Sequence, residues 1–295
     1  MIMRRALTVI LLAAALSVLL SGCGSTGGEN TENNAFFYES FDSEQKSAYD
    51  AFMRSIEDPF SGKETEILSE NGEIIAMPRD SLDLIYQGLL YDHPELFWLD
   101  RTYAYRPVTN GNDEEMADAV AVIPVAASEG ELNKLKHAFD ESSDSLLEGI
   151  DPKIGDGAAA EKIYERLIRH AVYRGEAADD PAFVLEHTAF GAIAGESAVC
   201  DGFALAYRYL LSKRGIPCLV IPGESSGMAH TWNTVYWDGC WHEADPAWDA
   251  SLTDNGEREY FDLTTEEMNK DHKREAGGLS ELIPVAGADS SNGLR

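Results

Sequence analysis

Cys200 begins an apolar run that predicts a helix. Alanine, leucine and aromatic residues recur at three- and four-residue spacing up to Leu211, and Lys213, Arg214 and Gly215 have the chemistry of a helix end. The partial positive charge at a helix N-terminus favours a thiolate over a thiol. We therefore expect Cys200 to be a nucleophile whose pKa lies below that of a free thiol.

Gly202 lies one step inside this predicted helix. Glycine in a helix interior costs about 1 kcal/mol relative to alanine. Its presence predicts that another backbone segment, or a substrate, comes close to this turn.

Two strands are expected between this helix and the dipeptide Asp238-Gly239. Residues 217–223 are apolar, and residues 231–237 are rich in aromatic and β-branched side chains. Asp-Gly is a favoured sequence for a two-residue type I′ hairpin turn. We therefore expect the residues after the turn to form a third strand that pairs with the second.

The hairpin brings two further candidate residues together. A two-residue turn makes Trp237 face Cys240, and the same register makes His230 and Asp245 diagonal neighbours on one face of the sheet. A three-residue loop would change this register, and His230 and Asp245 would then no longer be expected on the same face. An imidazole oriented by a carboxylate can accept a proton from a thiol, so the chain order Cys, His, Asp predicts a catalytic triad.

The segments around these residues resemble the core motifs of the transglutaminase-like superfamily. The resemblance extends over about residues 161–249 and rests on Cys200-x-Gly-Phe-Ala, Gly215-Ile216-Pro217, His230-x-Trp232-Asn233 and Asp245-Pro-Ala-Trp-Asp249. It implies an α+β, papain-like fold in which a helix carrying the cysteine packs on an antiparallel sheet carrying the histidine and the aspartate. It also implies acyl transfer, with Cys200 attacking a peptide or glutamine-type amide, His230 moving the proton and Asp245 orienting the imidazole.

Tyr173 is the candidate oxyanion donor. Animal transglutaminases use a tryptophan upstream of the cysteine, and Tyr173 is the nearest corresponding position in this chain. Its phenol could donate a hydrogen bond alongside the backbone N–H of Cys200. A packing role for the ring is the alternative.

The resemblance leaves the acyl acceptor open. A thioester that passes to water makes a peptidase or amidase, and one that passes to an amine makes a protein-crosslinking transglutaminase. We favour hydrolysis because the chain is shorter than the multidomain animal crosslinkers. A catalytically inactive lipoprotein that binds peptides or the cell wall is the third hypothesis. We expect no cofactor, and Cys240-x-His242 lacks the paired ligand spacing of a structural zinc site.

The N-terminus has the pattern of a secreted lipoprotein. Two arginines precede an apolar stretch that ends in Leu20-Ser21-Gly22-Cys23, which is similar to a bacterial lipobox. We expect a signal peptide over residues 1–22, lipidation at Cys23 and a polar tether over residues 23–35. These features predict an extracytoplasmic protein held at the bacterial cell surface by a lipid anchor in the membrane.

The chain is strongly acidic. Its formal net charge is −29, and removal of the predicted signal peptide would delete two arginines and no acidic residue, giving −31. Such a surface repels nucleic acid. We therefore expect no nucleic-acid partner, while the family resemblance implies a protein or peptide substrate.

The remaining chain divides into two structured parts without a clear linker. Predicted elements are helices over about 44–57, after Asp80, from the capping box Ser128-x-x-Glu131 to about 147, from the cap Asp156, over 181–193 and after Thr264, and strands over 97–108, 117–126 and 259–263. We assign an N-terminal α+β region to residues 36–150, a transglutaminase-like catalytic domain to 151–275 and a loose C-terminal tail to 276–295.

Two cysteines and five histidines have no assigned role. Cys218 and Cys240 fall on neighbouring predicted strands and could form a disulfide or remain buried thiols. We expect five histidines to be solvated or structural; these are His137, His170, His187, His242 and His272.

Overall fold

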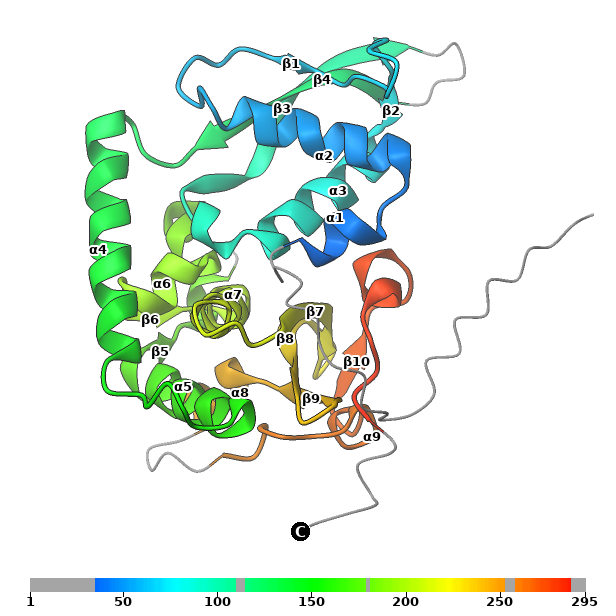
Figure 1. The fold of residues 1–295 in the computed structure, drawn as a ribbon. Coiled ribbons are helices and arrows are strands. Elements are labelled where there is room, and N and C mark those ends of the chain that lie inside the picture. Colours follow the sequence, from blue (N-terminus) through cyan, green and yellow to red (C-terminus); the bar gives the residue numbers. More distant parts are fainter. Residues whose placement is uncertain (1–34, 110–114, 179–180, 253–257, 288–295) are drawn as a thin grey trace, which may run out of the picture.

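The computed structural model describes residues 35–109, 115–178, 181–252 and 258–287 (Figure 1). The predicted signal peptide, Cys23 and nearly all of the tether lie outside these ranges. Among the helices in the described ranges, none combines the length and the apolar character needed to cross a membrane.

Helix α7 (Cys200–Ser212) lies at the centre of the molecule, where Figure 1 shows it end-on. Its residues from Gly202 to Leu211 are all buried, because helices and strands pack around its whole circumference. The packed elements include α5 (Asp156–His170), α6 (Ala189–Ile193), α8 (Pro246–Leu252), β7 (Cys218–Ser225) and β8 (Met228–Trp237).

A four-stranded antiparallel sheet packs against α7. Its strand order is β10-β7-β8-β9, with β9 at Cys240–Ala244 and β10 at His272–Arg274. The sheet carries His230 on β8, and Asp245 follows directly after β9. The α+β fold with a cysteine helix on an antiparallel sheet is therefore confirmed.

The N-terminal region forms a second sheet covered by helices, in the upper part of Figure 1. The long hairpin strands β3 and β4 pair with each other, and the two-residue strands β1 and β2 pair with the other edge of β4. The elements are α1 (Phe36–Ser40), α2 (Ser43–Ser55), β1 (Thr65–Glu66), β2 (Met77–Pro78), α3 (Arg79–Asp92), β3 (Leu99–Thr109), β4 (Glu115–Pro124) and α4 (Glu129–Leu147).

Side-chain caps fix where several helices begin. The Asp42 carboxylate accepts a hydrogen bond from the backbone of Gln45, whose side chain accepts one in return. Ser128 caps α4 as predicted, although the Glu131 side chain reaches the N–H of Ala127 rather than that of Ser128.

Short elements complete the fold. Strands β5 (Val172–Tyr173) and β6 (Ser197–Ala198) pair in parallel. The others are η1 (Pro94–Leu96), η2 (Gly175–Ala177), η3 (Pro181–His187), α9 (Thr265–Met268) and η4 (Gly278–Leu282).

One buried apolar cluster runs through both predicted parts of the chain. Phe97 from the N-terminal region lies with its ring centre 4.4 Å from that of Phe139 on α4 and 5.1 Å from that of Phe190 on α6. Phe139 also contacts Tyr209 on α7, at 4.7 Å. The assigned N-terminal region and catalytic domain therefore share a core.

Two predicted helices differ from expectation. The helix expected over 181–193 is two pieces, η3 and α6, separated by Thr188 in an extended conformation. The break leaves the carbonyl of Glu186 free to accept a hydrogen bond from Val199, just before α7. Asp156, expected as a cap, is the first residue of α5, and Gly155 precedes it as the N-cap.

The strand predicted over 259–263 was wrong. Only an isolated bridge forms there, between Leu263 and Glu243. The backbone N–H groups of Glu259 and Tyr260 instead donate to the buried carboxylate of Asp249. These N–H groups therefore bond to a side chain and not to the backbone of a neighbouring strand.

The loose tail predicted from residue 276 was also wrong over its described part. Residues 276–287 pack on the protein, with Leu279, Ile283 and Ala286 buried. The Ser280 hydroxyl donates to the carbonyl of Pro222 on β7, at 2.6 Å. Residues 288–295 lie outside the described ranges.

Candidate active site

Cys200 is the first residue of α7 and is partly buried. Strand β6 leads into this position. A Cβ atom added at Gly202 would lie 2.3 Å from the carbonyl oxygen of Glu186 and 2.9 Å from that of Thr188. The close backbone approach predicted at Gly202 is therefore confirmed, and it brings the η3–α6 break against the start of the cysteine helix.

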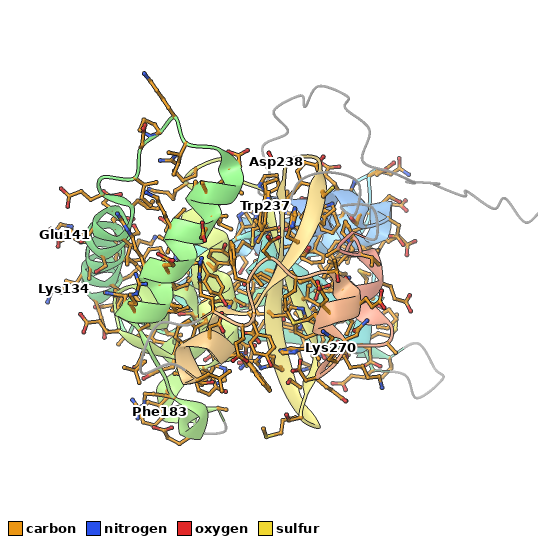
Figure 2. The ribbon with its side chains drawn as sticks, turned by 90° about the horizontal axis from the view of Figure 1, so that it is seen from below. Lys134, Glu141, Phe183, Trp237, Asp238 and Lys270 are labelled. Atoms are coloured by element: carbon orange, nitrogen blue, oxygen red, sulfur yellow. The ribbon has the colours of Figure 1, made fainter. Side chains whose placement is uncertain are left out.

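The predicted hairpin register is confirmed. Asp238 and Gly239 have φ angles of 50° and 83°, as a type I′ turn requires, and Figure 2 labels Asp238 beside Trp237 at this end of the sheet. Trp237 pairs with Cys240. The two-residue turn thus determines which residues of β8 and β9 share a face.

His230 and Asp245 meet as this register predicts. The Nε2 atom of His230 lies 2.5 Å from Oδ2 of Asp245, and both side chains are buried. The other carboxylate oxygen accepts hydrogen bonds from the backbone N–H groups of Ala247 and Trp248, at the start of α8. Because a carboxylate only accepts hydrogen bonds, the His230 ring donates one to Asp245 through Nε2, and Nδ1 remains available for the thiol.

The electrostatic surroundings keep Asp245 ionised. Burial disfavours the charged carboxylate, but hydrogen bonds and charge interactions with His230 and His272 outweigh this effect and lower the pKa of Asp245 to about 2. Asp245 is therefore an anionic acceptor throughout the neutral range.

The start of α7 is fastened to the strand that carries His230. The sulfur of Cys200 lies where the backbone N–H of Thr231 can donate to it, and the Thr231 hydroxyl donates to Oδ1 of Asp201 at 2.7 Å. Thr231 directly follows His230 in the sequence. The structure therefore brings the cysteine, the histidine and the aspartate of the predicted triad to one place.

The expectation of an acidified thiol was wrong. Burial, together with the charges of the Asp201 and Asp245 carboxylates, raises the pKa of Cys200 to about 12. The backbone N–H groups of Asp201 and Thr231 act in the opposite direction but do not compensate. In the unliganded protein the sulfur is therefore a protonated thiol, because removal from water and negative neighbours outweigh the helix N-terminus.

Tyr173 lies beside this thiol. It is on β5, whose partner strand β6 ends two residues before Cys200. Burial, together with the charges of Cys200 and Asp245, raises the pKa of Tyr173 to about 12. The phenol therefore stays protonated at neutral pH and can donate a hydrogen bond.

A polar cluster at Asp201 was not anticipated from the sequence. Oδ2 of Asp201 lies 3.2 Å from Nδ1 of His187 and 3.2 Å from the guanidinium of Arg101. Although burial opposes ionisation, these partners and Thr231 lower the pKa of Asp201. Arg101 comes from β3, so the N-terminal region reaches the residue next to Cys200.

A cavity of about 360 Å³ adjoins this cluster. It lies between the N-terminal region and α7, and its wall combines apolar side chains with Arg101, His187 and Asp201. Its apolar lining includes Leu84, Leu90, Tyr91, Phe97 and Leu205.

His272 was expected to be solvated or structural, yet it contacts the candidate site. Its Nε2 atom lies 2.9 Å from the same Asp245 oxygen that His230 contacts, and its Nδ1 atom lies 2.6 Å from the carboxylate of Asp271. The surrounding sequence has no strand-like alternation that would have revealed this position. Gly223 was the available signal, since a glycine within an apolar strand often marks close approach of another backbone.

His230, Asp245 and His272 offer ligand atoms within 4.8 Å of one another, a spacing that metal ions also use. Around tetrahedral zinc, with bonds of about 2.0–2.2 Å, neighbouring ligand atoms are held roughly 3.3 Å apart. The separations of 2.5 and 2.9 Å from the two ring nitrogens to Asp245 are those of direct hydrogen bonds instead. The geometry fits a hydrogen-bonded network better than a metal centre.

The suggested disulfide between Cys218 and Cys240 is absent. Cys218 is a free, buried thiol on β7, while Cys240 lies on β9. Strand β8 separates the two, because Cys218 pairs with Val235 and Cys240 with Trp237.

Comparison with known proteins supports the resemblance seen in the motifs. No protein-family model matches the chain. The Kyphoscoliosis peptidases of Homo sapiens and Mus musculus are each 33% identical to it over 67 residues. This match covers 19% of the chain and 10% of either relative, so the chain spans about a tenth of their length.

The chain resembles the transglutaminase-like superfamily. The residues that carry this resemblance lie on the cysteine helix, on the antiparallel sheet and in the His230–Asp245 pair. A crystal structure described as a TGase aligns over 56% of this chain and 48% of its own, with 16% identity and a TM-score of 0.36.

Proposed function

We propose that the protein is a cysteine acyl-transfer enzyme that cleaves peptide or glutamine-type amides through a thioester on Cys200. The observation that carries this proposal is the buried hydrogen bond from His230 to Asp245, near Cys200 at the start of α7, which interacts with Asp245 and with the backbone of Thr231. A thiol, a base and an orienting carboxylate are the components of nucleophilic catalysis.

Acylation begins with Cys200 as a thiol. As the sulfur of Cys200 bonds to the amide carbon, its proton moves to Nδ1 of His230, the ring nitrogen that Asp245 does not occupy. The raised pKa of the thiol supports this concerted transfer over a thiolate formed in advance. Asp245 stabilises the resulting imidazolium.

The oxyanion is stabilised by neighbouring donors. We assign this role to the Tyr173 phenol and the backbone N–H of Cys200, which as a first-turn amide has no partner within its helix. His230 then gives its proton to the departing amine or ammonia, the C–N bond breaks and the thioester remains. In deacylation, His230 takes a proton from water, the hydroxyl adds to the carbonyl, and the sulfur leaves and regains its proton.

Water is the proposed acceptor. The relatives that match this chain are named peptidases, which supports hydrolysis over crosslinking. An amine in place of water would give a protein-crosslinking transglutaminase. The third possibility is a catalytically inactive protein that binds peptides or the cell wall.

One experiment separates these functions. The protein is incubated with glutamine-containing peptides and a labelled primary amine, and ammonia release, peptide cleavage and amine incorporation are followed together. Cleavage or deamidation without incorporation, lost in Cys200→Ala, supports the proposal. Incorporation of the labelled amine would show that an amine, not water, is the acyl acceptor. If no reaction occurs, the hypothesis of a catalytically inactive binding protein remains.

Cys218→Ala is the matched thiol control, since it removes a buried thiol on β7 rather than the one at the start of α7. Iodoacetamide should label the wild-type protein at Cys200, and it should label Cys218→Ala equally.

We also propose that the enzyme is anchored outside the bacterial cell through a lipid on Cys23. The support is the apolar N-terminal stretch and the lipobox-like Leu20-Ser21-Gly22-Cys23. Membrane fractionation tests this directly: the full chain should sediment with membranes, and Cys23→Ala should not carry lipid. Equal lipid labelling of both chains would overturn it.

A further inference from the structure

His272 places both of its ring nitrogens against carboxylates. Nε2 lies 2.9 Å from Asp245 and Nδ1 lies 2.6 Å from Asp271. Because carboxylates accept hydrogen bonds, both ring nitrogens must carry a proton to make both bonds, which makes the ring a cation. Burial opposes that charge, yet the two carboxylates outweigh it and raise the pKa of His272.

The fold brings this side chain to the site from a distant part of the chain. Strand β10 pairs with β7, and a Cβ atom at Gly223 would lie 2.4 Å from the carbonyl of Lys273 and 2.5 Å from the Trp232 ring. The absent side chain lets β10 lie close to the sheet. The His272 side chain is fully buried there, with aromatic ring centres 5.1–5.4 Å away in Trp232, Trp248 and Tyr260.

Charged and titratable groups surround His272 and Asp245. Titratable groups reach His272 from three neighbouring segments: His230 on β8, Asp245 after β9, and Tyr260, whose hydroxyl donates to Asp271. A cationic His272 already compensates the negative charge of Asp245. Adding a second cation at His230, with its ring centre 5.3 Å from that of His272, is unfavourable in a site with little water.

We propose that His272 is a positioning residue that stays protonated, shares the carboxylate of Asp245 and thereby keeps His230 neutral until Cys200 delivers its proton. The inference rests on the proposed function, because it assigns His230 as the base. It adds a second histidine to the candidate triad. This histidine does not itself touch the reacting atoms.

The test uses His272→Gln, which keeps an N–H donor for Asp245 but carries no charge. Two pH profiles are measured between pH 5 and 9: kcat/KM for the amide substrate, and the rate of Cys200 alkylation by iodoacetamide. Without the cation, His230 should take up a proton more readily. The acidic limb of kcat/KM should move upward by about one pH unit, and alkylation at pH 6 should become about tenfold faster as the thiolate–imidazolium pair forms.

His242→Gln is the control, since His242 forms a similar pair with Asp262 on the same sheet. Both of its profiles should match the wild type. The inference is overturned if both His272→Gln profiles keep their wild-type pH midpoints, even when the rates fall uniformly. A purely structural role would lower the rates without shifting the midpoints.

Asp271→Asn provides a second route if His272→Gln does not fold. It leaves the ring in place but removes one of the two carboxylates that favour the cation, so both profiles should shift in the same direction by less. Unchanged midpoints would again overturn the inference. Cys200 alkylation can be measured without a substrate. If the variant shifts the pH profile of alkylation but the protein cleaves no amide, the proposed function is contradicted and the role of His272 is supported.

Discussion

The carboxylate of Asp92, at the end of α3, lies 3.3 Å from the guanidinium of Arg208 in the middle of α7, and both side chains are buried. Asp92 also accepts hydrogen bonds from the backbone of Phe37 and Tyr38, and Arg208 also donates to the carbonyl of Cys218. The N-terminal helices are thus tied electrostatically to the helix that begins with the candidate nucleophile.

Removing one partner of this buried pair should be strongly destabilising. Asp92→Ala leaves the Arg208 charge uncompensated and should lower the free energy of unfolding by about 3–5 kcal/mol in urea denaturation. The double variant Asp92→Leu, Arg208→Met removes both charges and should lose less. A single variant that loses under 1 kcal/mol would contradict the importance of the pair.

Asp245 should contribute stability that depends on pH. Its folded pKa of about 2 lies below its ordinary value of 3.8, so the contribution is complete above that ordinary value and is lost as the pH falls toward 2. A shift of this size corresponds to about 2 kcal/mol. Unfolding free energies of the wild type and Asp245→Asn, measured between pH 7 and 2, should differ in slope over this window. Asp262→Asn, at an exposed carboxylate, is the control and should leave the slope unchanged.

Gly202 should not tolerate even a methyl group. In Gly202→Ala the new Cβ would lie 2.3 Å from a backbone oxygen, so the start of α7 must shift and Cys200 must move with it. We expect a loss of about 2 kcal/mol or more in unfolding free energy, together with most of the activity. Gly130→Ala on α4 has open space around its Cβ and should instead raise stability by up to about 1 kcal/mol.

Tyr173→Phe tests the oxyanion assignment. Loss of the phenol donor should lower kcat by about 10²-fold while KM changes little, since the bond forms chiefly in the transition state. Tyr236→Phe, which removes a hydroxyl from the partly exposed face of β8, should leave kcat unaltered. An unchanged kcat in Tyr173→Phe would leave the ring with a packing role.

The sequence predicted the His230–Asp245 contact because one short-range feature determines it. Asp238-Gly239 specifies a two-residue turn, and strand alternation carries that register to the site. The break at Thr188 was not predictable in this way, because it depends on the close packing of Glu186 and Val199 against α7. Periodicity describes one segment at a time and does not detect such contacts.

The state of the thiol and the position of His272 were missed for a related reason. The helix N-terminus at Cys200 could be read from the sequence, but its burial beside Asp201 and Asp245 depends on the folded surroundings. His272 reaches the site through a three-residue strand in a polar stretch, paired with β7 far upstream in the sequence. Helix ends and tight turns are local in sequence, whereas the charge environment is assembled from distant segments.

The late position of β10 in the chain affects the order in which the site is assembled. Polypeptides leave the ribosome N-terminus first, so Cys200, His230 and Asp245 are all translated before the residues that bring His272 against Gly223. Given the role proposed for His272, a nascent chain holds its nucleophile, base and carboxylate before the second imidazole arrives. The hydrogen bonds to Asp245 are therefore complete only after residues 272–274 have joined the sheet.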